Sequence, residues 1–455
     1  MDNSYPMGRM PRLLLLVLAT LCVLGIWWPQ PGGATFQWIP GSSDAENDAI
    51  RYSTSTPTEA VSRLQRRMDA GEVTLRWDAR GGYLRSVLQA LRIPVASQAL
   101  VLSKTSFQRA LISPGRPRAL YFRDGVYVGW VQGGRVLEIA SVDPRLGAVF
   151  YTLSQEPATT PRFQRQTQAC LHCHDSPSLT DGVPGLIMQS VHPDTDGEPI
   201  LSAGTLVTSD QSPLKERWGG WYVTGTHGAQ RHMGNLTTTR APGGTPLDPA
   251  AGASVTDLRT RVDTRPYLSA HSDLVALMVL EHEVQLYNLI IRAGYRSRMA
   301  LAFDEVRSRE LGRAPGQITE STRNLVSRVA EPLVRAMLFV EEAALTEPVS
   351  GTSGFSRTFA RQGPRDHAGR SLRELDLTQR LLRYPCSYLI YSASFDALPA
   401  PVTDYVYLRL WQVLNGDDAS GAFAHLAPRD RAAILEILLD TKPAFAVWRT
   451  GRVPR

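Results

Sequence analysis

Two cysteines and a histidine are grouped in one short stretch of this 455-residue chain. Cys170 and Cys173 are separated by two residues, and His174 follows the second cysteine directly, which gives the pattern C-x-x-C-H. Two thiols at this spacing can form thioethers with the two vinyl groups of a porphyrin, and the adjacent imidazole can then bind the iron. The pattern therefore predicts covalent attachment of one haem c through Cys170 and Cys173, with His174 as an axial iron ligand.

Two other uses of these cysteines remain open. Cys170 and Cys173 could form a redox disulfide of the thioredoxin kind, or they could contribute to a zinc site. The zinc alternative is disfavoured because the side chains of residues 170–174 are too close together to surround one tetrahedral ion, and no second C-x-x-C is present. Of the other two cysteines, Cys22 lies in an apolar N-terminal run, and Cys386 lies in an apolar, aromatic stretch where we expect a buried thiol.

A haem iron bound by His174 on one side has a second axial position on the other side. An electron carrier usually supplies a second protein ligand, often a methionine or a histidine. We expect Met233 to be this sixth ligand, with His232 and His227 in the same loop as alternatives. Met188 and His192 are further options, and an open or water-filled position is another.

A further histidine lies in the C-terminal half of the chain, in the sequence Glu281-His282-Glu283. This group could hold a metal or supply acid–base chemistry beside an open haem iron. A histidine in an apolar helix, with Met278 one turn before it, is more often a packed core residue. The sequence is compatible with both interpretations of His282.

The sequence on both sides of the motif has the pattern of β-strands, and these strands would position the motif. Residues 119–153 have the pattern of antiparallel hairpins, with turn signals between the strands. The turns are expected at Asp124-Gly125, at Gly133-Gly134 and from Asp143 to Gly147. Residues 200–209 and 219–228 are also expected to form strands. A motif flanked by sheet differs from the small all-helical cytochromes, in which the motif lies near the start of the chain.

The second half of the chain has helical periodicity. It follows a linker rich in glycine and proline at residues 241–254. One helix is expected to begin at Ser272, and a second to extend from Thr319 to Ala344 with Pro332 kinking or dividing it. Further helical patterns lie around residues 375–382, 402–414 and 429–439.

These patterns predict an α+β fold class, in which a haem region containing an antiparallel sheet is followed by a mainly α-helical C-terminal region. A simple all-α small cytochrome is not expected. Three parts follow from this division. They are residues 1–35 as an N-terminal membrane anchor or signal segment, residues 36–240 as the α+β region carrying the haem, and residues 255–455 as the mainly helical region.

The N-terminus predicts export, which haem attachment to cysteines requires in bacteria. Arg9 and Arg12 precede an apolar run from Leu13 to Trp28, with the basic residues on the side expected to stay inside. Because the run is longer than the usual core of a signal peptide, we expect an uncleaved anchor, with a cleaved signal as the alternative. The predicted location is the periplasmic side of the bacterial inner membrane, or the periplasm after signal cleavage.

Composition excludes some classes of partner. The net charge is +6, with 43% hydrophobic and 20% charged residues, which is typical of a globular protein. Lysine and arginine are scattered and form no basic block, so we expect no nucleic-acid partner. The chain has a single C-x-x-C-H, so we expect one haem and therefore neither a multihaem wire nor a two-haem peroxidase.

The sequence resembles a group of exported bacterial proteins that carry a c-type cytochrome-like haem motif. The resemblance covers most of the exported chain, and its segments are NDAIRYS, SKTSFQRALISPGRPRALYFRDGVYVGWV, CLHCH, ERWGGWYVTGTHG and YPCSYLIYSASFDALPAPVTDYVYLRLWQVL. It implies covalent haem with its iron, export and electron transfer. The functional residues that the resemblance carries over are Cys170, Cys173 and His174.

The function expected from these observations is one-electron transfer by an exported, membrane-anchored single-haem c-type cytochrome. Its partner would be a redox protein in the periplasm or the membrane. The alternative is a haem-dependent redox enzyme, or a gas or redox sensor, with an open distal site. The alternative is retained because the chain is far larger than an electron carrier needs.

Overall fold

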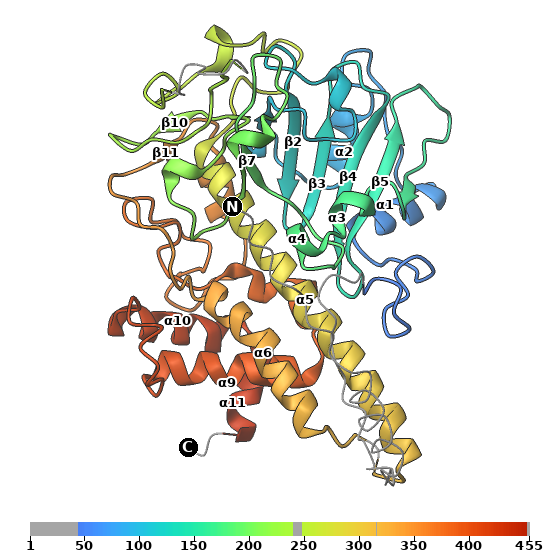
Figure 1. Cartoon of the computed structure of the whole chain (residues 1–455), viewed down its shortest axis with the longest axis vertical. Helices are drawn as coiled ribbons and strands as arrows, with labels where there is room; N and C mark the ends of the chain where they lie inside the picture. The colour runs from blue at the N-terminus through green and yellow to red at the C-terminus, as the bar shows by residue number, and fades with distance from the viewer. Residues whose placement is uncertain (1–43, 240–247, 315, 453–455) are drawn as a thin grey trace, which may run out of the picture. The chain divides into compact units, whose positions relative to one another are not determined.

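The computed structural model describes residues 44–239, 248–314 and 316–452. A seven-stranded antiparallel sheet occupies the N-terminal half and helices dominate the C-terminal region (Figure 1). The α+β fold class predicted from the sequence is confirmed. The described residues belong to one compact unit, and the division into residues 36–240 and 255–455 stays a prediction. The predicted anchor or signal at residues 1–35 lies outside the described residues.

The central sheet has the strand order β6-β5-β4-β3-β2-β1-β9. Its strands are β1 (Ala99–Val101), β2 (Arg118–Arg123), β3 (Val126–Trp130), β4 (Val136–Asp143), β5 (Gly147–Ser154), β6 (Gln164–Gln166) and β9 (Trp221–Tyr222). Two short ladders lie outside this sheet. They are formed by β7 (Gln189–Val191) with β8 (Thr205–Val207), and by β10 (Gly225–Thr226) with β11 (Ser350–Gly351).

Glycine-containing turns set the register of the hairpins, as the sequence predicts. Arg123 pairs with Val126 across Asp124-Gly125, and the two turn residues have φ angles of 47° and 80°. Positive φ at both positions is what a tight two-residue hairpin turn requires. Gly125 also has no room for a side chain, because a Cβ there would lie 2.9 Å from the phenol of Tyr287.

The longest described helix is α5 (Leu274–Glu310), and it packs against the end of the sheet. Asp273 caps it, because its carboxylate accepts hydrogen bonds from two backbone amides of the first turn. Tyr295 donates its hydroxyl to the carbonyl of Leu146 in the β4–β5 turn (2.7 Å). By length and composition α5 could cross a membrane, with a mean hydropathy of 1.4, but 83% of that stretch is buried in the protein. Its apolar surface is therefore used in packing.

The other helices are shorter. They are α1 (Ala60–Asp69), α2 (Leu84–Ala90), α3 (Leu171–His174), α4 (Pro177–Thr180), α6 (Glu320–Met337), α7 (Phe355–Ala360), α8 (Ala393–Asp396), α9 (Ala400–Asn415), α10 (Pro428–Thr441) and α11 (Pro443–Arg452). Of these, α6, α9 and α10 match predicted helices. α6 begins after its N-cap Thr319 as expected, but it ends at Met337, because Phe339 and Glu341 adopt positive φ angles of 55° and 64°.

One predicted helix is wrong. Residues 375–382 form no helix, and Leu375 instead makes an isolated antiparallel bridge with Leu382. Asp376 explains the difference, because its carboxylate accepts hydrogen bonds from the backbone amides of Thr378 and Gln379. A side chain that binds its own backbone in this way competes with helix formation and favours a turn.

Candidate haem site

The C-x-x-C-H residues lie on one short helical turn, α3, which follows strand β6 and has Cys170 as its N-cap. Cys170 is half-buried, Cys173 is exposed, and the two thiols are not joined by a disulfide. Burial is the main cause that raises the pKa of Cys170 to about 11, so this thiol is protonated at neutral pH. The helical turn places Cys170, Cys173 and His174 along the wall of one cavity.

His174 is held by a hydrogen bond that fixes its tautomer. Its Nδ1 lies 3.0 Å from the carbonyl oxygen of Gly185, so Nδ1 carries the proton and donates it. The Nε2 lone pair is thereby left for a metal, which is how metal-binding histidines are commonly oriented in proteins. Burial lowers the pKa of His174 to about 4, so the ring is neutral at physiological pH. The ring packs on Phe150, with 4.6 Å between the centroids.

The loop that carries this carbonyl is fastened to α5. The side chain of Asn288 accepts a hydrogen bond from the amide of Leu186 (2.8 Å) and donates one to the carbonyl of the same residue (2.7 Å). Gly185 allows this close approach, because a Cβ there would lie 2.7 Å from the Asn288 oxygen. α5 therefore positions the group that orients His174.

The cavity beside the motif has a volume of about 680 Å³, within the range of cofactor sites. One face of the sheet forms part of its wall, because Tyr127, Ala140 and Phe150 are successive cross-strand partners and all line it. Leu280 and Val284 of α5 also line it. Further apolar lining residues are Val101, Leu120, Leu186, Met188, Val191 and Trp221. A flat apolar ring attached to Cys170 and Cys173 therefore fits the lining of this cavity.

The structure does not bring the three predicted sixth ligands to this cavity. Met233, His232 and His227 are absent from its lining. His227 and His232 are buried with their rings in contact, at 4.9 Å between centroids, and the Met233 sulfur accepts a hydrogen bond from Ser190. Met233 as sixth ligand, with His232 or His227 as the alternatives, thus has no support from the geometry.

Met188 is the thioether that lies in the cavity wall, and it is almost completely buried. His192, the other further option, does not line the cavity. Zinc binding has no geometric support either. Within residues 44–239, 248–314 and 316–452, no group of three or more His, Cys, Asp or Glu side chains could hold a metal ion.

His282 is a fully buried core residue with both ring nitrogens occupied. Its Nδ1 lies 2.6 Å from the carboxylate of Asp210, and its Nε2 lies 2.7 Å from Ser387 Oγ. The ring stacks on Phe339 at 4.6 Å. This Asp–His–Ser chain resembles a hydrolase triad, but Ser387 is 0% exposed and its oxygen also accepts the amide of Leu389. No substrate can reach that oxygen, so the chain stabilises the core.

A buried carboxyl on α5 is connected to the cavity through Tyr127, whose side chain lines it. Glu283 accepts hydrogen bonds from the hydroxyls of Tyr388 (2.9 Å) and Tyr127 (3.3 Å). Burial raises the pKa of Glu283 to about 7; the charge of Asp124 adds to this rise and that of Arg373 opposes it. This carboxyl is therefore protonated in the folded protein over much of the mildly acidic range.

Stability should consequently fall as pH rises through this range. The folded state keeps a proton on Glu283 that the unfolded chain releases near the ordinary pKa of 4.5, so the stabilisation is complete below that value and is lost as pH rises through about 7. Glu283→Gln removes this titration. The free energy of unfolding should therefore fall less between pH 4.5 and pH 7 in the variant than in the wild type, by up to about 3 kcal/mol. Denaturant unfolding at several pH values measures this. Glu305→Gln, at an exposed position of α5, is the matched control, and equal slopes for Glu283→Gln and wild type would refute the assignment.

Similarity to known proteins adds nothing to this site. Comparison with models of protein families, with curated proteins and with solved structures finds no match for the chain. The features that characterise the site are therefore the motif, the cavity beside it and the hydrogen bond that holds His174.

Proposed function

We propose that this protein is an exported single-haem c-type cytochrome that transfers electrons one at a time. The observation that carries the proposal is the cavity itself: an apolar space of about 680 Å³ is bordered by both cysteines and by the histidine of one C-x-x-C-H motif. When bound there, haem would supply an iron that alternates between ferrous and ferric states.

The residues of the chain have separate roles in this proposal. Cys170 and Cys173 would hold the haem covalently, and His174 would bind its iron through Nε2. The Gly185 carbonyl keeps the His174 ring in the required tautomer and orientation. The apolar part of the lining would shield the haem from water, which limits reorganisation when an electron arrives.

Met188 is the residue that we propose as the sixth ligand, because it places a thioether in the wall of the cavity that holds His174. A methionine opposite a histidine raises the reduction potential and closes the iron to exogenous ligands. An open sixth position would instead favour the alternative function, a haem-dependent redox enzyme or a gas or redox sensor.

Absorption spectra of the exported chain, made with a cytochrome maturation system, distinguish these functions. We expect six-coordinate low-spin spectra in both oxidation states, with no change on adding carbon monoxide. A high-spin spectrum that carbon monoxide shifts readily would refute the electron carrier and support an open site.

The location and partner belong to the same proposal. Haem is joined to cysteines outside the bacterial cytoplasm, so the chain would work on the periplasmic side of the inner membrane, held there by its N-terminal segment or released after cleavage. Its partner would be a redox protein in the periplasm or the membrane. Fractionation of cells into membrane and periplasm, followed by haem staining, tests the location.

A further inference from the structure

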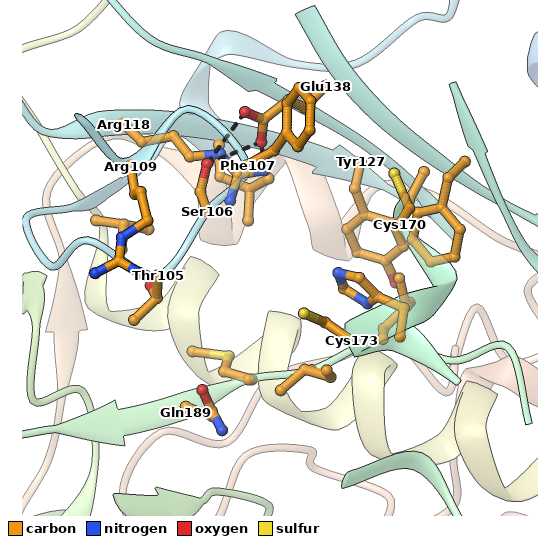
Figure 2. Close-up of a pocket in the computed structure, with 18 of the residues that line it drawn as sticks. Thr105, Ser106, Phe107, Arg109, Arg118, Tyr127, Glu138, Cys170, Cys173 and Gln189 are labelled. Atoms are coloured by element: carbon orange, nitrogen blue, oxygen red, sulfur yellow. Dashed lines mark hydrogen bonds and ion pairs between the residues drawn. The ribbon is translucent and has the colours of Figure 1, made fainter. Parts of the chain in front are cut away.

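The wall of the cavity is polar at the end opposite the cysteines. Figure 2 shows Cys170 and Cys173 on one side of the cavity, and Ser106, Arg109 and Arg118 across from them. Haem is likewise divided into an apolar edge and a polar edge. Its two vinyl groups, which form the thioethers, and its two propionate carboxylates lie on opposite edges of the ring.

Arg118 is the most enclosed of the arginines at this polar end, with its side chain 20% exposed. Its guanidinium forms an ion pair with Glu138 at 3.1 Å. Its Nε is shielded from solvent and has no hydrogen-bond partner among the described residues. A buried donor without an acceptor is costly, and such groups are usually satisfied by a ligand, an ion or water.

A glycine in the sheet leaves room for this guanidinium. Arg118 lies over Gly129 of β3, where a Cβ would come within 2.5 Å of its terminal nitrogen. Gly129 is the cross-strand partner of Glu138, so the glycine leaves the path from Arg118 to Glu138 open. A glycine inside a strand often marks such a close approach.

Glu138 is already well supplied with donors. Its carboxylate accepts hydrogen bonds from the Ser106 hydroxyl (3.0 Å) and from the side-chain amide of Gln108 (3.0 Å), in addition to the Arg118 pair. Glu138 therefore fixes the position of Arg118 without using all of the N–H donors of the guanidinium. An arginine has five N–H donors in a planar fork, so some remain for a second acceptor.

Two other cations line the cavity with Arg118, and both have acidic partners outside its lining. Lys104 pairs with Asp196 and Arg109 pairs with Glu198, and both cations also line the cavity. Because these two charges are balanced outside the cavity, Arg118, with its unpartnered Nε, is the cation available to a carboxylate inside it.

We propose that Arg118 binds a carboxylate inside the cavity, and that this carboxylate is a propionate of the covalently attached haem. The inference depends on the proposed function and deepens it, because it assigns the end of the cavity that the propionates occupy. Arg118 would pair with the propionate through donors that Glu138 leaves free, as charge-assisted arginine–carboxylate pairs do.

The test is the pH dependence of the reduction potential of the loaded exported chain. An arginine beside a carboxyl lowers its pKa, so Arg118→Gln should raise the proton affinity of the propionate about tenfold. The step in the plot of potential against pH should then move to higher pH by about one unit. Arg123→Gln is the matched control, because Arg123 lies on the same strand, pairs with Asp124 and does not line the cavity.

The outcomes separate this inference from the proposed function. Wild-type chain without covalent haem on a denaturing gel would overturn both. Covalent haem together with a pH profile of Arg118→Gln that matches the profiles of wild type and Arg123→Gln would overturn this inference alone. Should Arg118→Gln fail to fold, Arg118→Lys decides. It keeps the charge but not the planar fork, so the propionate bending band in resonance Raman spectra should shift, and an unchanged band would overturn the inference.

Discussion

Replacing both Cys170 and Cys173 by alanine should abolish covalent haem completely. Each thiol would supply one of the two thioethers, and the cavity lining has no other cysteine. Haem staining after denaturing electrophoresis measures the outcome directly, because only covalently held haem stays with the chain. We expect a stained band for the wild type and none for the double variant.

Cys386 supplies the matched control for this experiment. It is a free thiol that is completely buried, and burial raises its pKa to about 12, so it is chemically inert in the folded protein. Cys386→Ala should therefore keep the full haem stain. Persistent staining of the double variant would refute the haem assignment, and with it the proposed function.

Replacing Met188 by leucine should open the sixth position of the iron. Leucine keeps a similar volume in the cavity wall but removes the thioether sulfur. The ferric spectrum should change from low-spin to high-spin, the ferrous protein should bind carbon monoxide, and the reduction potential should fall, because a methionine ligand raises it. Absorption spectra and a redox titration of both proteins give these readouts.

Met233→Leu is the matched control, because it makes the same chemical change at a residue outside the cavity lining. It should leave the spectrum unaltered. The opposite pattern, with Met233→Leu opening the iron and Met188→Leu silent, would contradict the cavity-based assignment and support the prediction made from sequence.

These two methionines show which parts of the site a sequence can predict. The spacing of Cys170, Cys173 and His174 is local, so it predicts a haem-attachment motif without knowledge of the fold. The choice between Met188 and Met233 depends on packing between distant segments. The loop that holds Met233 is fastened elsewhere by Asn235, whose side chain exchanges two hydrogen bonds with the backbone of Val223.

The same distinction holds for the elements of the fold. Asp124-Gly125 predicts a hairpin correctly because the turn residues alone determine its geometry. The helical pattern around residues 375–382 misleads, because the carboxylate of Asp376 closes a turn that apolar spacing does not reveal. Helix α6 ends at Met337, before the predicted end at Ala344, because residues beyond Met337 adopt positive φ angles. The hydrophobic pattern does not reveal this backbone conformation.

Arg118 is a site residue that the sequence analysis missed. A signal was present in Gly129, which interrupts an otherwise well-filled strand and so indicates a close approach by another group. That signal does not say which group approaches. The answer needs the three-dimensional structure, in which Glu138 is the cross-strand partner of Gly129 and the Arg118 side chain crosses the glycine to reach Glu138.

The walls of the cavity also constrain the order of events during synthesis. The motif ends at His174, whereas Leu280 and Val284 of α5 line the same cavity from far downstream. Asn288, which secures the loop that orients His174, is later still. Until α5 has packed against the sheet, the cysteines lie in an incomplete and accessible site. Under the proposed function we therefore expect haem loading to precede the docking of α5, so that folding would enclose a cofactor that is already bonded to the chain.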